Sequence, residues 1–164
     1  MKHLPANCLI LLGFLSQSQC RRAGPCGNAN EPVGERWAER SDAEVQQRVT
    51  RALSCGRARG TRVLLEFTAP WCADCRAMSA LEEQPEVASV LDTQYERVRI
   101  NVRRWDAHRV LSERYQVRAI ATYVVLDPHT QAVVAKSTRE PVTGSDGTLT
   151  AAQWAAWLRA PTGH

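Results

Sequence analysis

The feature that most constrains the fold of this chain is a short apolar segment that runs directly into a closely spaced pair of cysteines. Val63–Phe67 reads V-L-L-E-F, which is typical of a β-strand buried on both faces. After a short connection come Cys72 and Cys75, and helix-forming residues continue to about Glu83. The junction predicts a buried strand followed at once by a helix whose first turn carries both thiols.

Strands and helices alternate on both sides of this junction. Ser41-x-x-Glu44 and Thr150-x-x-Gln153 have the pattern of a capping box, so each predicts the start of a helix. Apolar periodicity and turn residues predict the other elements. The order predicts one α/β domain over residues 36–160, a central mixed sheet with helices on both faces. The expected helices cover residues 41–55, 72–83, 86–91 and 107–115 and a last one from 150, and the expected strands cover 63–67, 97–102, 122–126 and 132–136, with a weak first strand at 36–39 and a basic loop at 57–61.

The charge of the chain is modest and widely distributed. The 164 residues carry a net charge of +4, with 19 Arg and 2 Lys against 17 acidic residues. Arg lies in every segment rather than in one patch with aromatic side chains, so solvated faces and ion pairs explain it better than nucleic-acid binding. We therefore expect no nucleic-acid partner.

The first residues have the three-part pattern of a secretory signal. Lys2 lies in a stretch without acidic residues, Cys8–Leu15 is a short apolar run, and Ser16-Gln17-Ser18 offers small residues at a cleavage site. We expect residues 1–19 to be a signal peptide and residues 20–35 a linker. The mature domain is then exported, to the periplasm.

Cys20 leaves a second form of the exported protein open. A cysteine soon after an apolar run can become the lipidated first residue of a bacterial lipoprotein, but Gln19 is larger than the residue that such sites favour. Cys8 is one of six cysteines and leaves with the signal. With Cys20 lipidated, four remain and can pair as Cys72–Cys75 and, as a structural bridge, Cys26–Cys55. With Cys20 free, one cysteine stays unpaired.

A C-x-x-C pair at a strand–helix junction favours redox chemistry over zinc binding. Cys72 lies at the predicted helix N-terminus, where free N–H groups and the helix dipole stabilise a thiolate. Cys75 lies one turn further on, close enough to form a disulfide with Cys72. A zinc ribbon needs a second pair of similar spacing, and the sequence has none. One thiol can attack a substrate disulfide and the other can resolve the mixed disulfide.

These residues resemble a known family. Phe67-x-Ala69-Pro70-Trp71-Cys72-x-x-Cys75 is similar to the active-site signature of the thioredoxin superfamily, and the element order over residues 36–160 is that of the thioredoxin fold. The likeness is greatest to exported bacterial thioredoxin-like domains, such as the C-terminal domain of the transmembrane thiol:disulfide interchange reductase. It implies a thiol-disulfide oxidoreductase without an organic cofactor, which acts on protein disulfides or thiols and exchanges electrons with an upstream redox partner protein. Cys72 would attack and Cys75 would resolve.

The resemblance also implies a role for Glu66. It lies six residues before Cys72, where thioredoxins carry a buried acid, usually Asp. We expect burial to raise the pKa of Glu66, so that it relays a proton for Cys75 near neutral pH. Arg99 is the expected charge partner, where thioredoxins place a Lys. The open alternative is that Arg97 and Arg99 lie on an exposed edge.

Two residues depart from the family pattern. Asp74 places a carboxylate between the cysteines, which disfavours the Cys72 thiolate, so we expect the reducing or isomerising direction. Ala121 stands where the family has a cis-proline that faces the cysteines. Because a cis bond before a non-proline residue costs about 2.5–4 kcal/mol, we expect this peptide to be trans. Trp71 and the loop Ile120-Ala121-Thr122 are the expected substrate ledge.

Two other functions stay open at this stage. Without a proline ring beside the thiols, Cys72 and Cys75 could hold a soft cation such as Cu(I), as in a copper-handling protein. The fold could also be a redox-silent binding module, although the intact cysteine pair argues against this. A Cys–His nucleophile is not favoured, because His108 and His129 are expected at the surface.

Overall fold

The structure, a computed structural model, describes residues 26, 35–143 and 147–163. The expected signal peptide, Cys20 and most of the expected linker lie outside these residues. None of the helices in the described part is both long enough and apolar enough to cross a membrane. The elements are α1 (Asp42–Arg59), β1 (Arg62–Thr68), α2 (Ala73–Glu82), α3 (Pro85–Gln94), β2 (Tyr95–Asn101), α4 (Arg109–Arg114), β3 (Thr122–Leu126), β4 (Val133–Thr138), the short 3-10 helix η2 (Glu140–Val142) and α5 (Ala151–Arg159).

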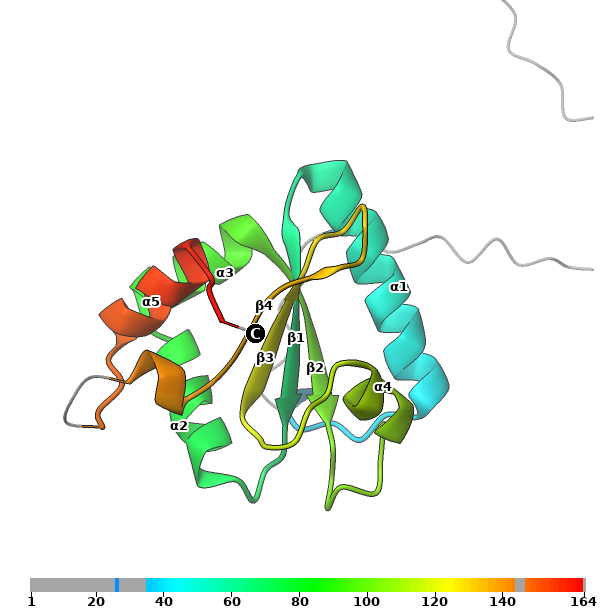
Figure 1. Ribbon diagram of the computed structural model, residues 1–164, viewed down its shortest axis with the longest axis horizontal. Helices are drawn as coiled ribbons and strands as arrows, with labels where there is room; N and C mark the ends of the chain where they lie inside the picture. Colours follow the sequence, from blue (N-terminus) through cyan, green and yellow to red (C-terminus); the bar gives the residue numbers. More distant parts are fainter. Residues whose placement is uncertain (1–25, 27–34, 144–146, 164) are drawn as a thin grey trace, which may run out of the picture.

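The described strands form one mixed sheet in the order β2-β1-β3-β4. β1 pairs parallel to β2 and antiparallel to β3, and β3 pairs antiparallel to β4. In Figure 1, α1 and α4 lie on one side of the sheet, whereas α2, α3 and α5 lie on the other. The predicted mixed sheet with helices on both faces is confirmed.

The central strand β1 serves both layers, because successive side chains of a strand point to opposite faces. Val63, Leu65 and Phe67 belong to the apolar cluster that includes α1. Leu64 belongs to the opposite cluster, which contains residues of α2, α3 and α5 together with both redox cysteines. Glu66 lies on the same face of the sheet as Leu64, the face that α2, α3 and α5 cover. The central strand of the core therefore also carries a charged group between the sheet and α2.

Both predicted capping boxes are confirmed. The Ser41 hydroxyl accepts from the Glu44 backbone N–H at 3.3 Å, and the Glu44 carboxylate accepts from the Ser41 N–H at 2.8 Å. Thr150 and Gln153 make the same reciprocal pair at 3.2 and 2.8 Å. Each box satisfies two backbone donors at the start of its helix, α1 and α5.

The expected weak strand at residues 36–39 is wrong. This segment forms a turn and irregular backbone, and the sheet of the described residues ends at β2 on this side. The contact of this segment with β2 is made by a side chain, because Asn101 Nδ2 donates to the Trp37 carbonyl at 2.7 Å.

The expected basic loop at 57–61 is also wrong over most of its length. α1 continues to Arg59, and Gly60 ends it in the left-handed conformation at φ 69°. Gly56, expected to end the helix, instead allows a close approach: a Cβ there would lie 2.8 Å from the Thr61 carbonyl oxygen and 2.9 Å from Pro128 Cβ. The short turn expected at 86–91 is the middle of α3, a helix of 10 residues with Pro85 in its first turn.

Candidate active site

The cysteine pair lies where β1 ends and α2 begins. Past the end of β1 the chain stays attached to β2, because the Val102 N–H donates to the Thr68 carbonyl at 2.9 Å. Cys72 is the N-cap of α2, and its Sγ accepts from the Cys75 backbone N–H at 3.1 Å. The two sulfur atoms are joined as a disulfide, with the Cα atoms 5.2 Å apart. A thiolate at Cys72 would receive the same backbone hydrogen bond and the favourable end of the helix dipole.

The two sulfurs differ in access. Cys72 is 7% exposed and Cys75 is 1% exposed. Trp71, the residue before Cys72, is 49% exposed, and its Nε1 donates to the Arg103 carbonyl. Cys72 is thus the more accessible of the two cysteines, and the residue before it in the chain presents an exposed indole.

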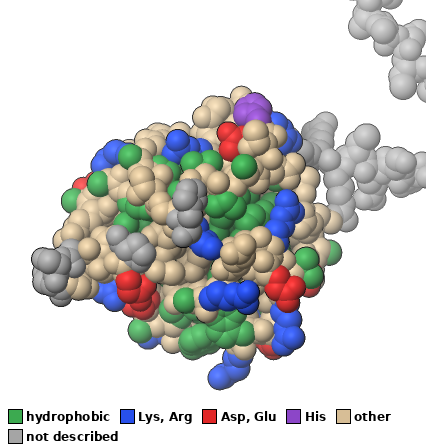
Figure 2. Space-filling view, in the orientation of Figure 1, with side chains coloured by type: hydrophobic (Ala, Val, Ile, Leu, Met, Phe, Trp, Pro, Cys, Tyr) green, Lys and Arg blue, Asp and Glu red, His purple; other side chains and the backbone are tan. Residues whose placement is uncertain are grey.

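Figure 2 shows an apolar area at the lower end of the visible face, the end at which β1 and β2 finish in Figure 1. On the rest of that face, Arg and Lys side chains are scattered, with acidic groups between them. Trp71 and Trp105, which follow β1 and β2 in the chain, are exposed large apolar side chains. Exposed apolar area of this kind is a surface on which a protein chain can lie.

The loop opposite the cysteines carries the expected ledge residues, and one expectation about it is wrong. The peptide bond between Ile120 and Ala121 is cis. Ala121 is buried in the same apolar cluster as Cys72 and Cys75, and Ile120 packs against that cluster. The next residue, Thr122, is already fixed in the sheet and donates from Oγ1 to the Ala119 carbonyl at 2.7 Å. These tertiary contacts outweigh the local preference of a non-proline bond for trans.

Asp74, the acidic residue between the cysteines, has a partner from a distant segment. Arg139, just after β4, places a guanidinium nitrogen 2.8 Å from the Asp74 carboxylate. The two side chains are 33% and 37% exposed, so the pair is partly screened by water. Arg139 therefore offsets part of the charge that Asp74 brings to the cysteines.

Four side chains form a buried charge cluster below α2: Glu66 on β1, Glu82 on α2, and Arg97 and Arg99 on β2. Arg97 Nε and Arg99 Nε donate to the two Glu66 oxygens at 2.7 and 3.0 Å. Both arginines also donate to the Glu82 carboxylate. The expected pairing of Arg99 with Glu66 is confirmed, and the alternative of an exposed edge is wrong. Two positive and two negative groups balance in the space between the sheet and the helix.

The expected rise in the pKa of Glu66 is wrong. Burial alone would raise the pKa of Glu66, but the attraction of Arg97 and Arg99 and the hydrogen bonds that they donate hold it below the ordinary value. Burial likewise opposes the charge on Arg97, yet Glu66 and Glu82 raise the pKa of that guanidinium. Glu66 is consequently a paired carboxylate at neutral pH.

Sequence reasoning missed two members of this buried region. Glu82 follows Cys75 by seven residues, two helical turns, so it lies on the same face of α2, and that spacing could have identified it. Tyr123 on β3 donates its hydroxyl to Glu82 Oε1 at 3.4 Å, and burial raises the pKa of Tyr123 well above its ordinary value. The tyrosine therefore keeps its proton and acts as a donor to the cluster.

Three further observations concern the remaining Cys and His residues. The structure joins Cys26 to Cys55 as a second disulfide, with the Cα atoms 5.3 Å apart.

The surface position expected for His108 is wrong, because the side chain is buried with Nδ1 2.6 Å from the Asp42 carboxylate. Within residues 26, 35–143 and 147–163, no group of three or more His, Cys, Asp or Glu side chains is arranged to hold a metal ion.

A dithiol that closes to a disulfide at a helix N-terminus, on a mixed sheet with helices on both faces, defines a thiol-disulfide oxidoreductase. Residues 44–128 match the family model described as thioredoxin-like, which covers just over half of the chain. The chain belongs to the thioredoxin-like family. A comparison with curated protein sequences found no match.

Solved structures show the same fold. A disulphide isomerase from Xylella fastidiosa Temecula1 is similar with a TM-score of 0.63 and 22% identity, over 75% of this chain and 95% of that one. The C-terminal domain of DsbD from Neisseria meningitidis, in the oxidised form, is similar with a TM-score of 0.55 and 19% identity, over 74% of this chain and 97% of that one. A thioredoxin from Thermus thermophilus is similar with a TM-score of 0.52 and 25% identity, over 66% of this chain and 78% of that one.

Proposed function

We propose that this chain is an exported enzyme that exchanges disulfides with protein substrates, in the reducing or isomerising direction. The observation that carries the proposal is the unequal access to the two sulfurs at the N-terminus of α2. Cys72 is 7% exposed and receives a backbone N–H, whereas Cys75, one turn behind it, is 1% exposed. This arrangement suits one attacking and one resolving thiol.

The reducing reaction has two exchange steps. The Cys72 thiolate attacks one sulfur of the substrate disulfide, the other substrate sulfur leaves as a thiolate and takes a proton, and a mixed disulfide remains. The Cys75 thiolate then attacks Cys72 Sγ, and the second substrate sulfur leaves. Two electrons pass to the substrate, and the enzyme holds the Cys72–Cys75 disulfide until a dithiol protein, the proposed upstream partner, reduces it.

Glu66 is our candidate for the group that receives the Cys75 proton before the second step. It lies on the side of β1 that faces α2, and the charged form held by Arg97 and Arg99 is the form that can accept a proton. The lowered pKa makes it a weak base, so Glu66 would hold that proton only briefly.

The substrate segment would lie across Trp71 and the Ile120-Ala121-Thr122 loop. Both flank the redox pair, through chain continuity at Trp71 and through shared apolar packing at Ala121. The partly exposed Trp71 and the neighbouring apolar area offer contacts to extended chains without selecting one sequence.

The direction of the reaction follows from the charge near Cys72. Asp74 disfavours the thiolate and so favours the disulfide in the enzyme, which makes the pair a better reductant. Arg139 offsets part of this effect. Equilibrating the domain against glutathione tests the direction, since a potential as high as that of strong disulfide oxidases would contradict it.

Export is the remaining part of the proposal. We propose that residues 1–19 are removed and that the mature chain works in the periplasm, where the second disulfide, Cys26–Cys55, serves as a structural bridge. Mass spectrometry of the mature protein from a bacterial host distinguishes a free Cys20 from a lipidated one.

The central experiment is insulin reduction with a dithiol as electron donor. The wild-type chain should accelerate precipitation of the insulin B chain, and Cys72→Ser should reduce the rate to the level of the donor alone. The matched control is the double variant Cys26→Ser, Cys55→Ser, which removes the other disulfide and should keep the activity. Equal activity of wild type and Cys72→Ser would overturn the proposal.

A further inference from the structure

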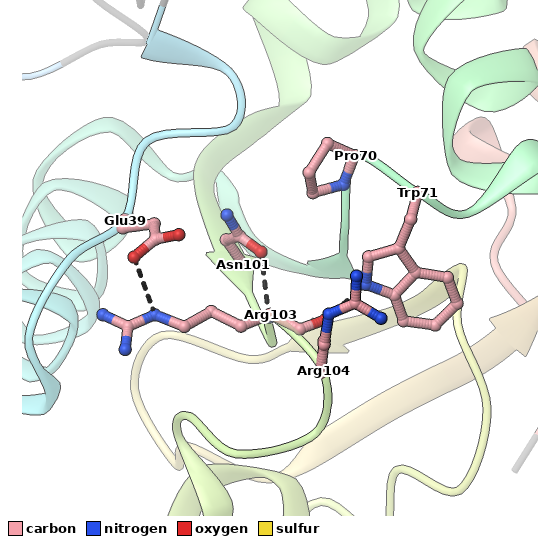
Figure 3. Close-up of a pocket in the computed structure, with 6 residues that line it drawn as sticks. All are labelled: Glu39, Pro70, Trp71, Asn101, Arg103 and Arg104. Atoms are coloured by element: carbon pink, nitrogen blue, oxygen red, sulfur yellow. Dashed lines mark hydrogen bonds and ion pairs between the residues drawn. The ribbon is translucent and has the colours of Figure 1, made fainter.

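A cavity of about 430 Å³ opens beside the redox pair. The segments that leave β1 and β2 form most of its wall, and the chain before α1 closes one side (Figure 3). Trp71 is next to Cys72 in the chain, so the wall of the cavity begins one residue, about 3.8 Å from Cα to Cα, from the attacking cysteine. The lining residues are Glu39, Pro70, Trp71, Asn101, Arg103 and Arg104.

The backbone around the cavity is held by its own contacts. Asn101 Oδ1 accepts from the Arg103 backbone N–H at 2.9 Å, and the Arg103 carbonyl accepts from Trp71 Nε1. Figure 3 shows the bond between Asn101 and Arg103 near the middle of the site, with Arg104 drawn in front of the contact between Trp71 and Arg103. The two Arg side chains thus extend from a segment that is fixed to the residue before Cys72.

The charges of the lining do not balance. Arg103 Nε lies 3.1 Å from the Glu39 carboxylate, an ion pair that lacks the geometry of a hydrogen bond. Within the described part of the chain, the Arg104 guanidinium has no charged partner, since Asp106 accepts only from the Arg104 backbone N–H, at 3.1 Å. Figure 3 places Arg104 on the Trp71 side of the cavity and Glu39 on the other side. The positive charge in excess therefore lies on the side of the cavity formed by Trp71, the residue before Cys72.

A carboxylate is the group that fits this combination. The fork of N–H donors on a guanidinium matches the two oxygens of a carboxylate, and the faces of Pro70 and Trp71 can accept the methylene groups that carry it. A cation would meet the charge of Arg104 at close range. A wholly apolar side chain would contact Pro70 and Trp71 but gain nothing from the exposed guanidinium of Arg104.

The geometry points to a specificity pocket for an acidic side chain close in sequence to the cysteine that Cys72 attacks in the substrate protein. This inference rests on the proposed function, because it names which protein disulfides the same site prefers. Clients with an acidic residue beside the disulfide react faster, since Arg104 attracts and positions them.

The test uses two synthetic peptides with one intramolecular disulfide each. They are identical except that the residues flanking the cysteines are Glu in one and Gln, which has the same shape without the charge, in the other. The pre-reduced protein is mixed with each peptide, and the second-order rate of peptide reduction is measured in a single turnover. We expect the Glu peptide to react about fivefold faster, the upper range for a partly exposed charge pair, and less so at high salt.

Variants of the lining locate the effect. Arg104→Gln should bring the ratio of the two rates close to one, and Glu39→Gln, which releases Arg103, should raise it. The matched control is Arg62→Gln, which removes an exposed Arg at the opposite end of β1 and should leave the ratio unchanged.

Each outcome decides between the inference and the function on which it rests. Reduction of neither peptide overturns the proposed function, and the inference with it. Reduction of both at equal rates overturns the inference alone, and so does a preference for the Glu peptide that persists in Arg104→Gln. A preference that Arg104→Gln abolishes and Arg62→Gln retains supports the pocket.

Discussion

The two ends of α2 carry charge in opposite ways. At the N-terminus, Cys72 is 7% exposed, and the Asp74–Arg139 pair is partly exposed and so partly screened by water. At the C-terminus, Glu82 is buried among Arg97, Arg99 and Glu66. Charges at the first end are weak and adjustable, as a thiol that must ionise requires, whereas charges at the second are fixed by burial. Changes at the start of α2 should therefore act mainly on the reaction, whereas changes at its end should act mainly on the stability of the fold, apart from the proton step that we propose for Glu66.

The largest expected effect comes from a substitution that stops the reaction at the N-terminus of α2 and leaves the charge cluster at its C-terminus unchanged. In Cys75→Ser, Cys72 still attacks but nothing resolves the mixed disulfide. Turnover of insulin should fall to background, and mass spectrometry should find the substrate covalently bound to Cys72. The new hydroxyl is buried in the apolar cluster, so the free energy of unfolding should fall by about 1–3 kcal/mol relative to the reduced wild type, while the charge cluster stays intact. Continued turnover would show that an outside thiol can do the work of Cys75.

The second prediction concerns a substitution in the buried charge cluster at the C-terminus of α2. Glu82→Ala leaves Arg97 and Arg99 with one carboxylate between them, and loss of one partner of a buried ion pair costs about 3–5 kcal/mol. The neighbouring Glu83 is the matched control, because it is 57% exposed and pairs only at the surface, with Arg36 at 2.8 Å. Glu83→Ala should cost less than about 1 kcal/mol. Urea unfolding measures the loss of stability in both variants. Equal losses in Glu82→Ala and Glu83→Ala would contradict the distinction between the buried and the exposed ion pair.

The third prediction concerns pH at the buried end. The pKa of Glu66 is lower in the folded chain than in the unfolded one, so its contribution to stability is present above about pH 4.3, the ordinary value for Glu. That contribution is lost as the pH falls through the folded pKa, because the unfolded chain then binds the proton first. Glu66→Gln should have a smaller free energy of unfolding than the wild type at neutral pH. On acidification it should lose less of that free energy than the wild type does. Urea unfolding between pH 7 and pH 3 checks the slope, which would stay unchanged if Glu66 were not involved.

The smallest expected effect adjusts the charge at the first end. Asp74→Asn should lower the pH at which half of the reduced Cys72 reacts with iodoacetamide, and Arg139→Ala should raise it. Both shifts should be below about one pH unit, since the pair is partly exposed. In the double variant the effect of Arg139→Ala should shrink, because its partner is gone. Two shifts that simply add would show that Arg139 acts on Cys72 without Asp74.

Much of the site follows from local sequence. The apolar run Val63–Phe67 makes a buried strand, and Cys72 and Cys75 are one turn apart at the start of the helix that follows. The capping boxes at Ser41 and Thr150 also act within four residues. Local spacing is enough in these cases, because the partners are neighbours in the chain.

Other features depend on partners that are distant in sequence. Arg139 meets Asp74 across 65 residues, and Arg97 and Arg99 meet Glu66 across 31 and 33. The pKa of Glu66 moved against expectation for this reason, since burial could be inferred from its neighbours but the two guanidinium groups could not.

The sequence by itself determined the pair of cysteines, their spacing and the helix that carries them in its first turn. The tertiary structure decided the charge around them, the cis peptide at Ile120–Ala121, and the cavity beside Trp71. The physical reason is the separation along the sequence over which each kind of interaction acts. Backbone hydrogen bonds and helix periodicity act over a few residues, whereas electrostatic partners and cavity walls come from segments that only the sheet brings together.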